Sequence, residues 1–135
     1  MLQRTKFKIT LYTVILANLF LLLGFGIYWL RAQNRDYQRL ADLKVWQNIL
    51  GDHFLKFGTY RLDNCQIGQT LSQCWAEKSG QVWINNINDP LNSGSYRYLV
   101  AGLADDDYQI NFSLEAGIGG LSPGTYVLTK NGVIH

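Results

Sequence analysis

The first 30 residues are dominated by one apolar segment. Positions 9–30 carry no charged residue, and 17 of these 22 side chains are apolar or aromatic. A helix over this segment is about 33 Å long, and the hydrocarbon core of a bilayer is roughly 30 Å thick. The segment ends Tyr28-Trp29-Leu30-Arg31, without the small residues of a signal-peptide cleavage site. The pattern therefore predicts an uncleaved transmembrane helix over 9–30.

An amphipathic pattern follows directly. Apolar residues recur at steps of three and four as far as position 57, and the chain has no proline before Pro90. Gly58 suits a helix C-cap, so the sequence predicts one helix over 9–57, about 49 residues long. The apolar stripe consists of Tyr37, Leu40, Leu43, Trp46, Leu50, Phe54 and Phe57. The charged residues expected largely off this stripe are Asp36, Arg39, Asp42, Asp52 and Lys56.

The C-terminal part has the pattern of a small sheet. Residues 59–89 lack a clear period and are predicted as loop with a short helical turn, and strands are predicted over 96–100, 108–114 and 125–129. Positions 105–107 form a hairpin loop, and Asn131-Gly132 a tight turn before a last strand at 133–134. The predicted fold is α+β, a long N-terminal helix packed on a small antiparallel sheet. The residues expected in the helix–sheet core are Leu43, Trp46, Leu50, Phe54, Tyr108, Ile110, Phe112 and Leu114.

The charges divide at the apolar segment. Residues 1–8 carry three basic residues and no acid, whereas residues 31–135 carry nine basic and ten acidic residues. By the positive-inside rule, residues 1–8 are a cytoplasmic stub and residues 31–135 an extracytoplasmic domain of a single-pass protein in the inner or cytoplasmic membrane. The overall charge of +2 therefore indicates orientation and not nucleic-acid binding.

Two cysteines lie in the part expected outside the cytoplasm. Cys65 and Cys74 are an even pair in an oxidising compartment, which favours one local disulfide. The alternative is a metal site completed by His53 and His135, although the cysteine and histidine spacings are not those of known metal motifs.

No sequence motif indicates catalysis or a cofactor. The chain has no nucleophile elbow and no phosphate-binding glycine loop, and we expect no enzyme activity and no small-molecule substrate. Asp89 and Glu115 are a pair able in principle to act as acid and base, provided that they lie close together. The acidic run 105–107 is expected to be a solvated turn, with Ca²⁺ binding as the alternative.

Three short motifs carry a resemblance to a known family. Arg39, Asp42, Leu43, Gln47 and Leu50 occupy the pattern R-x-x-D-L-x-x-[IL]-Q-x-x-L, residues 57–60 are similar to N-G-x-Y, and Asp89-Pro90 with Tyr96-Arg97-Tyr98 is similar to D-P…Y-x-Y. Together these motifs resemble the type IV pilin and type II secretion pseudopilin superfamily. The resemblance implies a pilin-like fold and a structural role in a secretion or pilus-like machine. Its partners would be other subunits, reached through the N-terminal helix, and the membrane.

The N-terminus departs from that family. Its members have a glycine before the mature N-terminus and a glutamate at the fifth mature position, but here no glycine precedes the apolar segment and residues 1–35 contain no acid. The sequence leaves open whether the chain enters a filament or stays unprocessed in the membrane. Asn18, Gly24 and Gly26 are expected in contacts between membrane helices, with local bonding or water as the alternative for Asn18.

A second functional hypothesis differs in class. A membrane-tethered binding module outside the cytoplasm would use the cysteine loop together with exposed Trp75 and Trp83 to hold a ligand or envelope polymer.

Overall fold

The computed structural model describes residues 2–62, 65–75 and 87–134, with side chains from residue 10 onward except that of Trp75. The chain divides into two compact units, Met1–Ala32 and Gln33–His135. One helix, α1 (Leu2–Phe57), contributes to both units.

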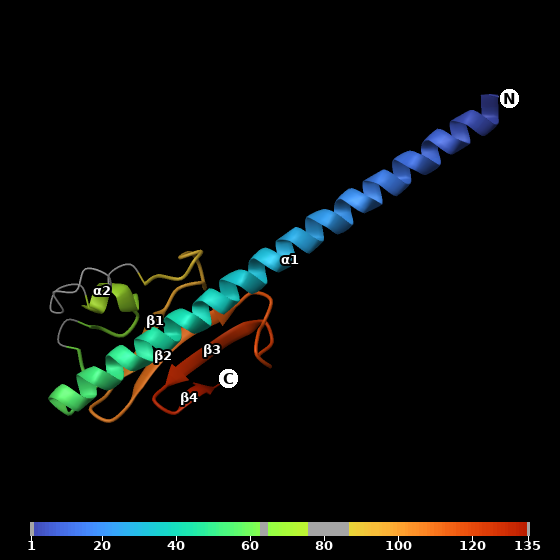
Figure 1. Cartoon of the computed structure of the whole chain (residues 1–135). Helices are drawn as coiled ribbons and strands as arrows, with labels where there is room; N and C mark the ends of the chain where they lie inside the picture. The colour runs from blue at the N-terminus through green and yellow to red at the C-terminus, as the bar shows by residue number, and fades with distance from the viewer. Residues whose placement is uncertain (1, 63–64, 76–86, 135) are drawn as a thin grey trace. The chain divides into compact units, whose positions relative to one another are not determined.

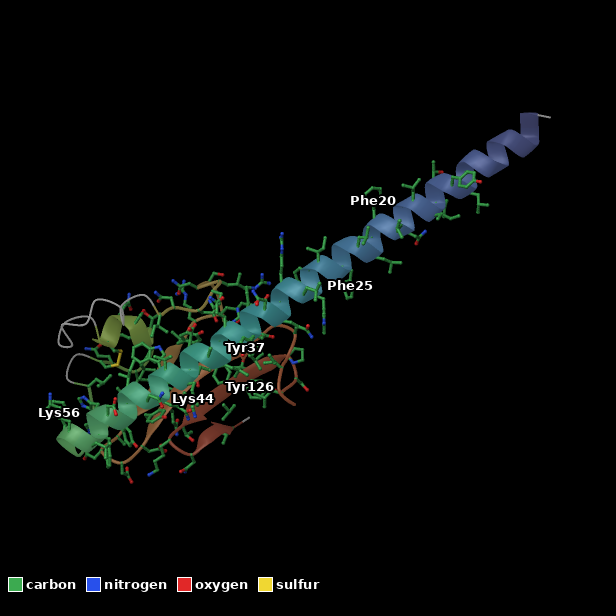
Figure 2. The ribbon with its side chains drawn as sticks, in the orientation of Figure 1. Phe20, Phe25, Tyr37, Lys44, Lys56 and Tyr126 are labelled. Carbon is green, nitrogen blue, oxygen red and sulfur yellow. A yellow bond between two sulfur atoms is a disulfide. The ribbon has the colours of Figure 1, made fainter. Side chains whose placement is uncertain are left out.

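In the N-terminal unit, α1 is long and apolar enough to cross a membrane. Its most apolar 18-residue window has a mean hydropathy of 2.0, and none of that window is buried. Large apolar side chains, among them Phe20 and Phe25, project from the helix (Figure 2). The helix begins at Leu2 and not at position 9, because the first residues include no proline or glycine and several good helix formers. Residues 2–8 therefore extend the predicted helix.

In the C-terminal unit, the remainder of α1 lies across one face of a four-stranded sheet (Figure 1). The strand order is β1-β2-β3-β4, and each strand is antiparallel to the next. The predicted α+β fold is confirmed. The elements after α1 are α2 (Leu71–Trp75), β1 (Leu99–Leu103), β2 (Tyr108–Leu114), β3 (Gly124–Thr129) and β4 (Gly132–Ile134).

The core of this unit lies between α1 and the inner face of the sheet. Of the residues predicted there, Phe54 is only half-buried, and its ring stacks on Tyr60 with centroids 4.6 Å apart. The others are almost completely buried, namely Leu43, Trp46, Leu50, Tyr108, Ile110, Phe112 and Leu114. At about 25 cal/mol per Å² of apolar surface, each large side chain removed from water contributes roughly 1.5–3 kcal/mol to folding.

The buried face of α1 differs from the predicted stripe at both ends. Tyr37 is 68% exposed and Phe57 is also exposed, whereas Asp36 and Arg39 are 0% exposed. The predictions for these four residues were wrong. Positions 36, 39, 43, 46 and 50 follow one another at steps of three and four, so they share one face of the helix. Charged residues occupy two positions of that face because partners on other segments neutralise them there.

The strands agree with the prediction at β2 and differ at both sheet edges. β2 has the predicted bounds and β3 starts one residue early, but β1 begins at Leu99 and not at position 96. Tyr96 and Tyr98 precede β1 because their side chains contact charged residues of α1. The β3–β4 turn is centred on residues 130–131, since Thr129 pairs with Gly132.

The cysteine loop lies against the free edge of β1. Cys65 and Cys74 form a disulfide, which confirms the pairing and overturns the alternative of a metal site, because both thiols are used. Within the loop, the Gly68 N–H donates to the Val100 carbonyl at 2.8 Å, and the Val100 N–H donates to the Gln69 carbonyl at 3.0 Å. The loop therefore satisfies backbone groups that an uncovered edge strand would expose.

Candidate functional site: a buried charge cluster on α1

Arg39 lies at the centre of a group of three carboxylates. Its Nε and Nη2 donate to the two carboxylate oxygens of Asp89 at 2.6 and 3.0 Å. Its Nη1 lies 2.6 Å from Asp36 and 2.7 Å from Glu115. The guanidinium carbon also lies 4.8 Å from the ring centroid of Tyr96. We call Asp36, Arg39, Asp89 and Glu115 the Arg39 cluster.

Asp36 joins the cluster to the segment that follows β2. Its carboxylate accepts the backbone N–H groups of Glu115, Ala116 and Gly117, at 2.9, 2.7 and 2.8 Å. Gly117 has φ +81°, and a Cβ there would collide with the carbonyl oxygen of Leu121. A glycine is therefore required for the chain to present three consecutive N–H groups to one carboxylate.

A second arginine completes the pairing of Glu115. Arg35 Nε and Nη2 donate to the two Glu115 oxygens at 2.7 and 2.6 Å. The hydrogen bonds from Arg35 lower the pKa of Glu115, and Arg39 lowers it further. Burial raises this pKa but is outweighed by the two arginines. Burial alone would lower the pKa of Arg39, but its bonds to Asp89, Glu115 and Asp36 outweigh burial and hold that pKa above its ordinary value. The geometry thus favours the ionised form of both Arg39 and Glu115.

One turn further along α1, Asp42 makes a separate contact with the segment before β1. The Tyr98 hydroxyl donates to the Asp42 carboxylate at 3.0 Å. Burial raises the pKa of Asp42, and the hydrogen bond from Tyr98 partly opposes that rise. Burial and the nearby charge of Asp42 together raise the pKa of Tyr98. The hydroxyl therefore stays protonated and continues to donate.

The cluster joins three segments that are far apart in sequence. It ties α1 to Asp89, 50 residues away, and to Glu115, about 80 residues from Arg35 and Asp36. Asp89 and Glu115 do lie close together, as acid–base work would require, but Arg39 binds both. A general acid needs a raised pKa, and that of Glu115 is lowered. The arrangement is suited to holding segments in place and not to proton transfer.

Sequence reasoning missed the burial of Asp36 and Arg39, although two signals were present. Both residues lie at steps of three and four residues before the buried Leu43 and Trp46, on the same face of the helix. In addition, Arg39 and Asp89 belong to two of the three motifs that carried the family resemblance.

The other candidate sites are simpler. Asp105 accepts a bond from the Thr59 hydroxyl at 3.0 Å and pairs with Arg61 at 3.1 Å on the surface. His53 Nε2 lies 3.1 Å from the Arg61 carbonyl oxygen. Over the described ranges, no three His, Cys, Asp or Glu side chains are grouped to hold a metal ion, and His135 lies outside those ranges.

The predicted membrane contacts lie in the N-terminal unit. The Asn18 side-chain amide donates to the Val14 carbonyl at 2.8 Å, which is the local bond considered as the alternative. At Gly24 and Gly26, an added Cβ would meet no atom within 4 Å. Trp83 lies outside the described residues, and only the backbone of Trp75 is described.

No protein-family model, curated protein or solved structure matches this chain.

Proposed function

We propose that this chain is a membrane-anchored structural subunit, without enzymatic activity, of a type II secretion or type IV pilus-like machine. The observation that carries the proposal is the continuity of α1. An uncharged segment long enough to span a bilayer continues as one helix into a unit where the helix packs on a four-stranded antiparallel sheet. This order of elements is that of the pilin and pseudopilin superfamily.

The convergence of the family-like motifs supports the same proposal. Arg39 of the helix motif binds Asp89 of the D-P motif and lies over Tyr96. Asp42 of the helix motif binds Tyr98. Two of the three motifs thus have a common structural reason, because each supplies part of the contact between α1 and the segment before β1.

The proposed topology places residues 1–8 in the cytoplasm and the C-terminal unit outside. The three basic residues of the stub support this orientation under the positive-inside rule. The Cys65–Cys74 disulfide is in keeping with an oxidising compartment for the C-terminal unit.

Site-specific photo-crosslinking tests the proposal. A photoreactive amino acid replaces Asn18 or Gly24 in the full chain, expressed in its own host, and the adducts are identified by mass spectrometry. We expect adducts to membrane helices of pilin-like or secretion-machine subunits. A matched probe at Leu55, which is strongly exposed in the C-terminal unit, is not expected to reach those helices.

The proposal fails if the probes in the apolar segment capture only lipid or unrelated membrane proteins. Intact-mass measurement of the extracted chain tests processing in the same sample. We expect residues 1–8 to be present, and a chain that begins at Phe25 would contradict an uncleaved anchor.

A further inference from the structure

We infer that the end of the C-terminal unit that bears the Arg39 cluster rests on the phospholipid headgroup surface, through two uncharged loops. The inference rests on the proposed membrane anchorage and adds a second, peripheral contact with the bilayer. The two loops, residues 90–95 and 118–123, are called the collar.

Chain length limits how far the start of the C-terminal unit can lie from the membrane. Arg35 lies five positions after Leu30, the last residue of the uncharged segment. Even a fully extended chain spans no more than about 3.6 Å per residue, or about 18 Å in all. The headgroup layer adds roughly 5–8 Å beyond each side of the hydrocarbon core. The start of the C-terminal unit therefore lies at most about 10–13 Å beyond the headgroup layer.

The Arg39 cluster holds both collar loops at this level of α1. Asp89 binds Arg39 and also accepts the N–H of Leu91 at 2.8 Å, which fixes the start of the first loop. Asp36 accepts the N–H of Gly117, immediately before the second loop. Figure 1 shows these two loops, in yellow and in orange-red, close to the same stretch of α1.

The surface of the collar is free of charge. Leu91 is 40% exposed, and on the adjoining turn of α1 Tyr37 is exposed, an aromatic residue with the polar tip suited to a membrane interface. The other exposed collar residues are Pro90, Asn92, Ser93, Gly94, Ser95, Gly119, Gly120, Ser122 and Pro123. They are small or polar and can approach headgroups closely.

The acids that the structure describes near the collar are withdrawn from the surface. Asp36 and Asp89 are buried, and the side chain of Glu115 is only 6% exposed. Each is paired with arginine, so none faces a lipid phosphate. The exposed cation nearest in sequence to the first loop is Arg97, whose charge is opposite to that of a phosphate.

The exposed acids of the described residues lie elsewhere on the unit. They are Asp52, Asp105 and Asp106, and Asp105 contacts Thr59 and Arg61 just after the C-terminal end of α1. Among the residues that the structure describes, exposed negative charge thus lies at the end of the unit away from the collar. A surface of phosphates, which repels carboxylates and accepts hydrogen bonds from hydroxyl, amide and guanidinium groups, matches this distribution.

Fluorescence quenching in vesicles tests the inference. The full chain is reconstituted in phosphatidylcholine–phosphatidylglycerol vesicles with an environment-sensitive dye on Leu91→Cys or, as the matched control, on Leu55→Cys. Both native cysteines are in the disulfide, so the dye reacts with the introduced thiol. We expect a headgroup-attached spin label to quench the Leu91→Cys dye several-fold more than the control dye. Aqueous iodide should show the reverse order.

A charge variant makes the test specific for the collar. Ser93→Glu places a carboxylate on the exposed first loop, and we expect it to reduce spin-label quenching of the Leu91→Cys dye several-fold. Asn48→Glu adds the same charge to an exposed position of α1, three turns from Tyr37, and should leave the quenching unchanged. Equal quenching of the Leu91→Cys and Leu55→Cys dyes, or no effect of Ser93→Glu, would overturn the inference.

Flotation of the same samples after a carbonate wash separates the two proposals. A chain that floats with the vesicles, but whose two dyes are quenched equally, refutes the collar contact and leaves the anchorage standing. A chain that does not float refutes the anchorage and, with it, the collar contact.

Discussion

Replacing Arg39 by methionine should strongly destabilise the C-terminal unit. Methionine retains much of the side-chain volume but removes the guanidinium that binds Asp36, Asp89 and Glu115 at 2.6–2.7 Å. Each of those carboxylates is almost completely buried. The variant therefore leaves negative charge in the protein interior without its principal partner.

The remaining contacts limit the loss of stability. Glu115 keeps both bonds from Arg35, Asp36 keeps three backbone N–H groups, and Asp89 keeps the N–H of Leu91. Asp89 thus loses the largest share of its stabilisation. Removing one partner of a buried pair typically costs about 3–5 kcal/mol, and we expect a loss in that range for Arg39→Met. Whole domains are stable by only about 5–15 kcal/mol.

Urea unfolding of the full chain in mild detergent, followed by near-ultraviolet circular dichroism, measures this loss. The control is Arg61→Gln, because the Arg61–Asp105 pair is 66% and 71% exposed and such pairs contribute about 0–1 kcal/mol. The double variant Arg39→Met with Asp89→Asn should recover about 0.5–3 kcal/mol of the loss, since it removes the stranded charge. A loss for Arg39→Met no larger than for Arg61→Gln would refute the reasoning.

Three further predictions use the same unfolding assay. The pKa of Glu115 is lowered in the folded state, so its pairing with Arg35 stabilises the fold above the ordinary glutamate pKa of about 4.3. That contribution should disappear as the pH falls through the lowered folded pKa, and Glu115→Gln should lack this part of the pH dependence; an unchanged profile would contradict the pairing. Replacing Cys65 and Cys74 by serine should lower the stability by about 2–3 kcal/mol, and thiol labelling of the unreduced wild-type chain would disprove the disulfide. Gly117→Ala should lower the stability by about 1–3 kcal/mol, because of its positive φ and the backbone oxygen in the way; a wild-type unfolding curve would count against that close approach.

Local pattern was enough to predict the regular elements. The uncharged segment, the absence of proline before Pro90 and Gly58 predicted a helix that ends at Phe57, as observed. The strict alternation over 108–114 predicted β2 with its observed bounds. These features depend on periodicity and on backbone chemistry, both of which are present within a few residues of sequence. The α+β fold followed from the order of the elements.

The boundary of β1 could not be predicted in the same way. Tyr96 and Tyr98 are good strand formers, yet they precede the strand. Their rings and hydroxyls are used by Arg39 and Asp42, more than 50 residues earlier in the chain. Tertiary contacts therefore overrode a local strand preference.

The sequence by itself determined the apolar segment, the long helix and the alternation that makes the sheet. Only the tertiary structure decided which face of α1 is buried near position 36, and that this face carries charge. A charged residue on a helix has the same sequence pattern whether it faces water or a distant counter-ion, and burial is tolerated only when that counter-ion is in place. For Asp36 and Arg39 the partners lie 50 and about 80 residues away, so folding alone brings them together.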